Sequence, residues 1–434
     1  MSDKFGNSTV GDLDPDFGPD GTGISWLEYP DGDNGFASGI TVTPDHKLLI
    51  AARSGQKYSI VRLTADGKQD DSFGNRGTVT GMFASGFKST GKSIRVLKDQ
   101  RILLDGLFDL EEFGAPPVRG LALYDDKGAL VSAFGEGGVT VVHPITSPQY
   151  ALSEEEKKQK GPSASSQNGN SIELPDGKLM VLSNHSYSFA DQIGLLMRLN
   201  PNGSLDTTFG DGKGYVPIQY LANSTWAGSL LHLQDGTFAV AGSAHVEGTS
   251  FAMIARFDAQ GIPVRNFGRN GFVLFDFQNP SSEITELVQM PDGNILGMGS
   301  TGQTGIFSGV MVCIDSKGAF AGSFNGGNPL LTPFPQAPLG IQWISGAQRD
   351  DNKIVVIANT LGESNSKLLL AQFHPTGEPD LGFGNQGKLM IDLTDVLDMA
   401  NGIAIQKGQI VVSGTSLPHP QGVCSFALRC SAVH

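Results

Sequence analysis

Eight residues of this sequence carry the side chains best suited to bind a ligand or to assist a reaction. Five of them fall in segments expected to be loops or strand ends: His185, Tyr187, Trp226, His245 and Trp343. Indole and phenol rings provide apolar walls with a polar atom, and an imidazole can exchange a proton near neutral pH. These side chains could line a ligand pocket, or His185 or His245 could act as a general base beside a carboxylate. The alternative for each aromatic residue is ordinary packing.

The other three candidates, Asn170, Glu286 and Asn401, belong to a recurring set. Its members are small or polar and stand six positions before the centre of a predicted turn: Gly39, Ser93, Asn170, Ser229, Glu286, Ser345 and Asn401. If the turns are arranged around an axis, this set surrounds one mouth of a central channel. There it could hold water, a cation or a small ligand. Glu286 alone in the set is charged, whereas a metal ion would require several oxygen ligands.

Motifs of the common enzyme classes are not found in the sequence. It contains no phosphate-binding loop, no His-Glu-x-x-His and no Gly-x-Ser-x-Gly. A catalytic zinc ion needs about three His or carboxylate ligands. The candidate imidazoles are His185, His232 and His245, and His232 is expected in a strand as a core residue. We therefore expect no metal and no cofactor, and a binding role is favoured over catalysis.

The charge and composition exclude several further classes. The net charge is −14, and no basic cluster is present that could bind a nucleic acid or an anionic membrane. No apolar run is long enough to span a bilayer. The N-terminus lacks the features of a secretory signal. We expect a cytoplasmic protein, or one exported without a cleavable signal, with Cys313, Cys424 and Cys430 as reduced thiols. We also expect a monomer.

The elements that position the candidates come from a repeat of about sixty residues. A Phe-Gly pair, preceded by polar residues and followed by glycine, recurs with its phenylalanine at Phe17, Phe73, Phe134, Phe209, Phe267, Phe324 and Phe383. The sixth copy has Asn325 in place of the glycine. A second landmark, such as Pro175-Asp-Gly-Lys, lies between two apolar runs in each copy and is typical of a tight hairpin.

Each repeat predicts four short antiparallel strands, here called a to d in chain order. In the second copy they cover residues 94–97, 102–105, 121–124 and 139–142. Four such strands, repeated seven times, predict an all-β, seven-bladed β-propeller occupying residues 1–434 as a single domain. The chain begins with a d-type strand at residues 23–28 and ends after a c-type strand at 425–429. We therefore expect the N-terminal strand to close the last blade.

The segment Arg198-Leu-Asn-Pro-Asn-Gly203, followed by Leu205-Asp-Thr-Thr-Phe-Gly, resembles the delta-60 repeat of bacterial proteins. It is also similar to NHL-type propeller repeats. The resemblance covers nearly the whole chain except residues about 143–170. It implies the propeller fold, and it names no activity because related propellers include scaffolds, binding proteins, lyases and hydrolases.

Residues 143–170 form an insertion between blades two and three. Ser153 and Glu156 match a capping box, which predicts a short helix over 154–160. The insertion is either a lid or docking arm over the channel mouth or a tolerated surface loop.

Function is expected on the face that carries the b–c and d–a loops, because these connections are long and irregular. The first hypothesis is a binding or scaffold module that engages a protein or a small molecule. The alternatives are a hydrolase or lyase with a site at the channel mouth and, ranked last, a carbohydrate-binding lectin.

Overall fold

The computed structural model describes residues 13–30, 32, 34–109, 117–142, 170–186, 192–419 and 422–431. The predicted helix at 154–160, nearly all of the insertion and Tyr187 lie outside these residues. The described chain is built from β-strands, with one short 3-10 turn at Asn325–Gly327. None of its helical segments is long and apolar enough to cross a membrane.

Most strands form antiparallel four-stranded sheets in chain order. The first sheet contains β2 (Gly35–Val42), β3 (Leu48–Ser54), β4 (Lys57–Leu63) and β5 (Thr78–Gly81). The second contains β6 (Ser89–Val96), β7 (Ile102–Phe108), β8 (Val118–Tyr124) and β9 (Val139–Val142). The third contains β10 (Ser171–Glu173), β11 (Leu179–Ser186), β12 (Gln192–Leu199) and β13 (Tyr215–Ile218). All four strands predicted for the second repeat are present.

The next eight strands are connected into one larger sheet. One antiparallel group contains β14 (Ser224–His232), β15 (Phe238–Val246), β16 (Thr249–Phe257) and β17 (Phe272–Phe275). The other contains β18 (Ser281–Gln289), β19 (Ile295–Gln303), β20 (Ile306–Ile314) and β21 (Leu330–Thr332). A parallel pair between Ser250 and Ser281 joins the two groups, so this connection is a local contact between two four-stranded units.

The last strands form two more four-stranded sheets. One contains β22 (Ile341–Gln348), β23 (Ile354–Thr360), β24 (Leu368–Phe373) and β25 (Lys388–Ile391). The other combines β26 (Leu397–Gln406), β27 (Gln409–His419) and β28 (Gly422–Cys430) with β1 (Ile24–Trp26) from the opposite end of the chain. β1 pairs antiparallel with β28, with Ile24 opposite Leu428.

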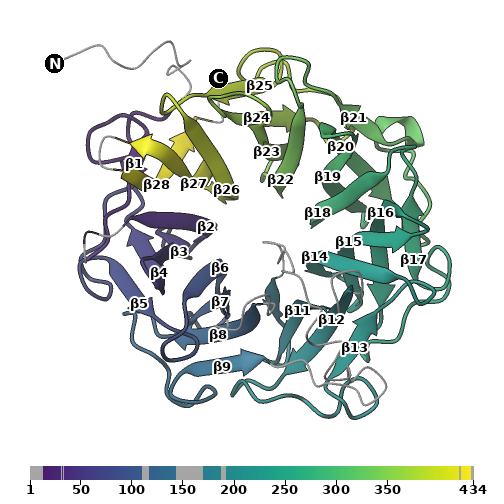
Figure 1. Cartoon of the computed structure of the whole chain (residues 1–434), viewed down its shortest axis with the longest axis horizontal. Coiled ribbons are helices and arrows are strands. Elements are labelled where there is room, and N and C mark those ends of the chain that lie inside the picture. The colour runs from purple at the N-terminus through teal and green to yellow at the C-terminus, as the bar shows by residue number, and fades with distance from the viewer. Residues whose placement is uncertain are drawn as a thin grey trace.

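Figure 1 shows the sheets arranged around a common centre, with β2, β6, β14, β18, β22 and β26 innermost and β5, β9, β13, β17 and β25 toward the outside. The middle strands are apolar on both faces because each sheet is covered by a neighbour on either side. Every residue of β7, for example, is buried. One apolar cluster combines Leu49 and Tyr58 of the first sheet with Ile102 and Tyr124 of the second. The core is therefore divided among the spaces between adjacent sheets.

The Phe-Gly landmark forms the joint between one sheet and the next. All seven phenylalanines are at most 5% exposed. Arg62 on β4 donates from Nε to Asp70 Oδ2 at 2.8 Å and lies over the Phe73 ring. Its Nη1 also donates to the carbonyl of Asp126. Asp126 lies two residues after the end of β8, in the second sheet. A Cβ added at Gly128 would lie 3.1 Å from the same ring. The repeat thus encodes an inter-sheet contact as well as a turn.

The hairpin landmarks adopt the backbone conformation that the sequence predicts. The third turn residue has a positive φ in copies with glycine, such as Gly177 (81°), and also where another residue stands there, such as Gln100 (71°). Asn325, which replaces glycine in the sixth Phe-Gly pair, has φ 45°. Asparagine tolerates this left-handed conformation better than most residues, so the sixth copy keeps the positive φ at this position, although residues 325–327 continue into the 3-10 turn that the other copies lack.

A β-bulge recurs in the innermost strands, and it determines which side chains reach the centre. In β6 the register shifts between Gly91 and Ser93, and equivalent shifts occur in β2, β14, β18, β22 and β26. A bulge places an extra residue against one partner residue and re-aims the side chains beside it. Six members of the recurring polar set predicted from the sequence lie at these bulges, and the seventh, Asn170, immediately precedes β10.

Candidate functional site

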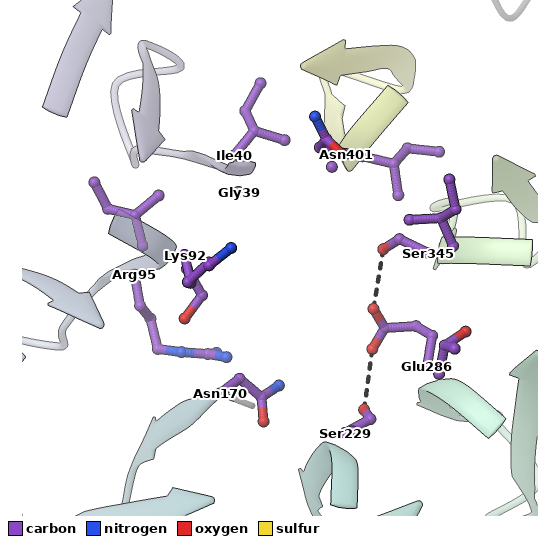
Figure 2. Close-up of a pocket in the computed structure, with 16 residues that line it drawn as sticks. Gly39, Ile40, Lys92, Arg95, Asn170, Ser229, Glu286, Ser345 and Asn401 are labelled. Atoms are coloured by element: carbon purple, nitrogen blue, oxygen red, sulfur yellow. Dashed lines mark hydrogen bonds between the residues drawn. The ribbon is translucent and has the colours of Figure 1, made fainter. Parts of the chain in front are cut away.

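A cavity of about 230 Å³ lies among the innermost strands, and all seven members of the predicted polar set line it. They come from six strands and from Asn170, which immediately precedes β10. Figure 2 shows Lys92 and Arg95 on one side of this channel cavity and Glu286 with its two serine partners on the other. The structure therefore brings together Asn170, Glu286 and Asn401, three of the eight candidates.

Glu286 is a hydrogen-bonding centre of the channel cavity. Its Oε1 accepts from Ser229 Oγ (3.2 Å) and from the backbone N–H of Leu287 (3.2 Å), and its Oε2 accepts from Ser345 Oγ (3.0 Å). The two serines belong to the four-stranded units on either side, so the carboxyl group links three consecutive units (Figure 2). Burial raises the pKa of Glu286 above its ordinary value, against the opposing effect of these hydrogen bonds.

The side-chain amides of Asn170 and Asn401 each form a hydrogen bond with the backbone of a neighbouring strand. Asn170 Oδ1 accepts from the N–H of Leu230 (3.1 Å), and Asn401 Nδ2 donates to the carbonyl of Ala37 (2.9 Å). Both bonds join innermost strands of adjacent sheets. One role of the polar set is therefore to hold these strands at a fixed separation.

Asn401 differs from the other members in its place on the strand. The hairpin after β26 is shorter than its counterparts: Gln406 pairs with Gln409, whereas the equivalent turn in the second sheet runs from Val96 to Ile102. Asn401 is consequently the extra residue of its bulge, in the place that Lys92 occupies in β6. Counting back from the turn identified the right region but shifted this member by one position.

Two cations in the cavity were not among the sequence candidates. Arg95 and Lys92 both line it, and Arg95 Nε donates to the carbonyl of Ser171 (2.9 Å). Burial lowers the pKa of Arg95, with Glu286 the first of the charges that oppose this effect. Burial also lowers the pKa of Lys92, assisted by the positive charge of Arg119. Because alternate residues of a strand share a face, the spacing of Arg95 from Ser93 was a usable signal for its position.

Trp226 and His245 lie together in a second cavity of about 420 Å³. The remaining lining residues are Gln192, Ser224, Thr225, Ser243 and Ser250. All seven residues of this Trp226–His245 pocket stand at or near strand ends that adjoin b–c or d–a connections, the face favoured from the sequence. Trp226 is half-buried and His245 is exposed. The Thr225 hydroxyl already has hydrogen-bond partners within the protein, since it donates to the Ile218 carbonyl and accepts from the Gly194 N–H.

The other candidates that the structure describes lie outside both cavities. Trp343 is 1% exposed, and its Nε1 donates to Thr332 Oγ1 (2.9 Å), so it packs inside the core between sheets. His185 lies on β11 opposite Ile193 and is half-buried. His232, expected in the core, is half-buried at the end of β14, where it stacks on Phe238 with ring centroids 5.1 Å apart. Among the described residues, no group of three or more His, Cys, Asp or Glu side chains could hold a metal ion.

Comparison with known proteins agrees with this architecture. A family model described as a β-propeller domain of unknown function (DUF5122) matches residues 174–209. The crystal structure of the polysaccharide lyase Uly1 is similar with a TM-score of 0.52 at 11% identity, covering 91% of this chain and 90% of that chain. A catalytically inactive virginiamycin B lyase from Staphylococcus aureus, crystallised with quinupristin, has a TM-score of 0.49 at 11% identity, covering 93% and 98% of the two chains. The comparison with curated proteins finds no match. The chain has an all-β fold of the β-propeller type.

Proposed function

We propose that this chain is a seven-bladed β-propeller of the delta-60 type that works as a binding module. In this proposal each four-stranded unit is a blade, and the pairing of β1 with β28 closes the ring. The same Arg–Asp–Phe contact supports the closure, because Arg429 on β28 donates to Asp14 at 2.7 Å and lies over the Phe17 ring. A rigid ring presenting unlike loops on one face is suited to binding one asymmetric ligand.

The observation that carries the binding proposal is the composition of the Trp226–His245 pocket. An indole, an imidazole and the hydroxyl groups of Ser243 and Ser250 converge there, and the volume of about 420 Å³ lies within the ~300–1,000 Å³ typical of ligand sites. A flat aromatic wall beside short donors and acceptors suits a small, uncharged polar ligand or a polar side chain of a protein partner.

The same lining argues against acid–base catalysis at this position. None of the seven lining residues that the structure describes is an aspartate or a glutamate, so these residues offer no carboxylate to orient His245 or to share its proton. A hydrolase or lyase with a site at the channel mouth remains the alternative function, and a carbohydrate-binding lectin the second alternative. The lectin predicts glycan binding without turnover, whereas the enzyme predicts turnover of its substrate.

The test is a binding screen of the purified protein against panels of short peptides and neutral oligosaccharides, read by tryptophan fluorescence and calorimetry. We expect a hit whose affinity falls at least tenfold in Trp226→Ala and His245→Ala. His374→Ala, a histidine half-exposed outside both cavities, is the matched control and should bind as the wild type does. Equal affinity in all variants would overturn the assignment to this pocket. Conversion of a bound oligosaccharide to products, lost in His245→Ala, would favour the enzyme.

A further inference from the structure

Buried charges of opposite sign face each other across the channel cavity. Lys92 and Arg95 lie on one wall and Glu286 on the other (Figure 2). In the part of the chain that the structure describes, no ion pair joins Glu286 to either cation. The carboxylate is held instead by two serine hydroxyls and one backbone N–H. The cavity therefore separates an anion from two cations.

The cations have capacity left for a ligand. The described hydrogen bond of the Arg95 guanidinium runs from Nε to the Ser171 carbonyl. This bond orients the guanidinium and leaves its two terminal nitrogens to donate to a ligand. No described hydrogen bond or ion pair is made by the Lys92 ammonium. A guanidinium offers a planar fork of donors that matches a carboxylate, and the nearby ammonium adds a second positive charge.

Keeping such groups apart inside a protein costs free energy, because each charge loses hydration without the direct ion pair that would compensate for it. The direction of the pKa shifts agrees with this cost, since burial disfavours the charged form of Arg95, Lys92 and Glu286 alike. A molecule that carries a negative group at one end and a positive group at the other would supply the missing counter-charge to both walls of the cavity. A simple anion would be repelled by Glu286, and a simple cation would be repelled by Lys92 and Arg95.

We propose that the channel cavity binds a small α-amino acid, with its carboxylate against Arg95 and Lys92 and its ammonium against Glu286. The volume of about 230 Å³ is below the range of drug-sized pockets and accommodates a molecule of a few non-hydrogen atoms. Ser229 and Ser345 hold the Glu286 carboxylate in place for the ammonium, so the acceptor is pre-organised. This site is separate from the Trp226–His245 pocket and does not depend on the function proposed for it.

The experiment measures binding of glycine, L-alanine, L-serine and L-aspartate to the full chain by calorimetry and by the shift in melting temperature. Acetate, ethylamine and sulfate are the probes for the two half-ligands and for a general anion site. We expect at least one amino acid to bind, and acetate and ethylamine to bind at least tenfold more weakly than it does. No binding of any amino acid would overturn the proposal and leave a hydrated channel. Equal binding of acetate or sulfate would overturn it in favour of a simple anion site.

Two variants identify the groups involved. Arg95→Gln and Glu286→Gln should each weaken amino-acid binding at least tenfold, and Glu286→Gln should also bind acetate more tightly than the wild type, because it no longer repels an anion. Arg101→Gln and Glu247→Gln are the controls: both residues lie outside the cavity, Arg101 half-buried and Glu247 exposed. Circular dichroism and melting curves establish that each variant is folded. Unchanged amino-acid affinity in a folded Glu286→Gln protein would contradict the assigned orientation. Trp226→Ala should leave this binding unaffected, which separates the two sites.

Discussion

Arg429 donates from Nε to Asp14 Oδ2 at 2.7 Å, although the two residues are 415 positions apart in the sequence. The guanidinium also lies over the Phe17 ring and donates from Nη1 to the carbonyl of Ala65 (2.8 Å). Arg62 makes the equivalent three contacts: with Asp70 and Phe73, which lie between β4 and β5 of its own sheet, and with the carbonyl of Asp126 beside the second sheet. The contact that fastens the N-terminal segment to the last sheet is thus one that a continuous chain makes within the first sheet.

We predict that Arg429→Met destabilises the protein by about 3 kcal/mol, because it leaves the Asp14 carboxylate buried without its cation. Urea unfolding measures the change. Arg101→Met removes a partly exposed pair with Asp99 and should cost less than about 1 kcal/mol. Deleting residues 1–29 should lower the melting temperature sharply, and an unchanged melting temperature would refute closure by the N-terminal strand.

Glu286→Gln should stabilise the protein at neutral pH when no ligand is bound. Because burial raises the pKa of this carboxyl group above its ordinary 4.5, folding favours the protonated form. The wild type therefore loses stability as the pH rises from 4.5 through the raised pKa. The uncharged amide does not titrate, so the advantage of the variant should grow with pH. Melting temperatures between pH 4 and 9 test this, and an advantage that shrinks with pH would contradict it.

Acid should weaken the joints between sheets. Burial tends to raise the pKa of Asp70, but hydrogen bonds from Ser72 and Lys47 outweigh it and hold the pKa at about 2. A lowered pKa contributes stability above the ordinary value of 3.8 that is lost as the pH falls toward 2, on the order of 2 kcal/mol. Urea unfolding from pH 5 to pH 2 should show this loss, and Asp70→Asn should flatten the curve. A parallel decline in the variant would assign the loss to other groups.

The hairpin turns offer a matched pair of backbone substitutions. Gln100 has φ 71°, a conformation that glycine adopts without strain, and Gly293 occupies the equivalent turn position with φ 84°. Gln100→Gly should stabilise the protein by up to about 1 kcal/mol, the relief of strain exceeding the entropic cost of glycine. Gly293→Ala should destabilise it by about 1 kcal/mol through strain alone, since no atom lies within 4 Å of the added Cβ. Chemical denaturation measures both, and changes of the same sign would contradict the argument.

The two tryptophans near the centre should respond differently to truncation. Trp343 is 1% exposed, and Trp343→Ala should cost about 3–5 kcal/mol by leaving a cavity in the core. Trp226 is half-buried in the wall of a pocket, and Trp226→Ala should cost clearly less. Comparable losses in the two variants would mean that Trp226 packs as a structural residue and would weaken its assignment to a binding pocket.

The strand positions could be predicted because the repeat carries local signals, namely Asp-Gly turns between apolar runs and a buried phenylalanine in each copy. The polar set at the centre could be predicted for the same reason, since a fixed distance from a turn defines a place on the innermost strand. Asn401 shows the limit of this method: a hairpin shorter than its counterparts moves the residue onto the extra position of a bulge.

The spacing of Arg95 from Ser93 indicates which face of the strand Arg95 occupies, but the repeat does not single out Arg95 or Lys92, because no other copy has a cation at either place. Their importance comes from Glu286, which is almost two hundred positions away in the chain and reaches the same cavity only through the arrangement of the sheets. The different surroundings of the two tryptophan candidates could not be predicted from the sequence either. Trp226 and Trp343 both lie near the start of an innermost strand, and tertiary packing alone decides that one lines a pocket and the other fills the core.

Because the contact between Arg429 and Asp14 fastens the chain ends together, the arrangement of the strands does not depend on where the chain begins. Since this non-covalent joint repeats contacts that elsewhere lie within a continuous chain, the natural termini could be linked and new termini opened between the third and fourth strands of another unit. A circularly permuted gene beginning within residues 258–262, between β16 and β17, would then produce the same arrangement of strands, with Phe267 in the place of Phe17.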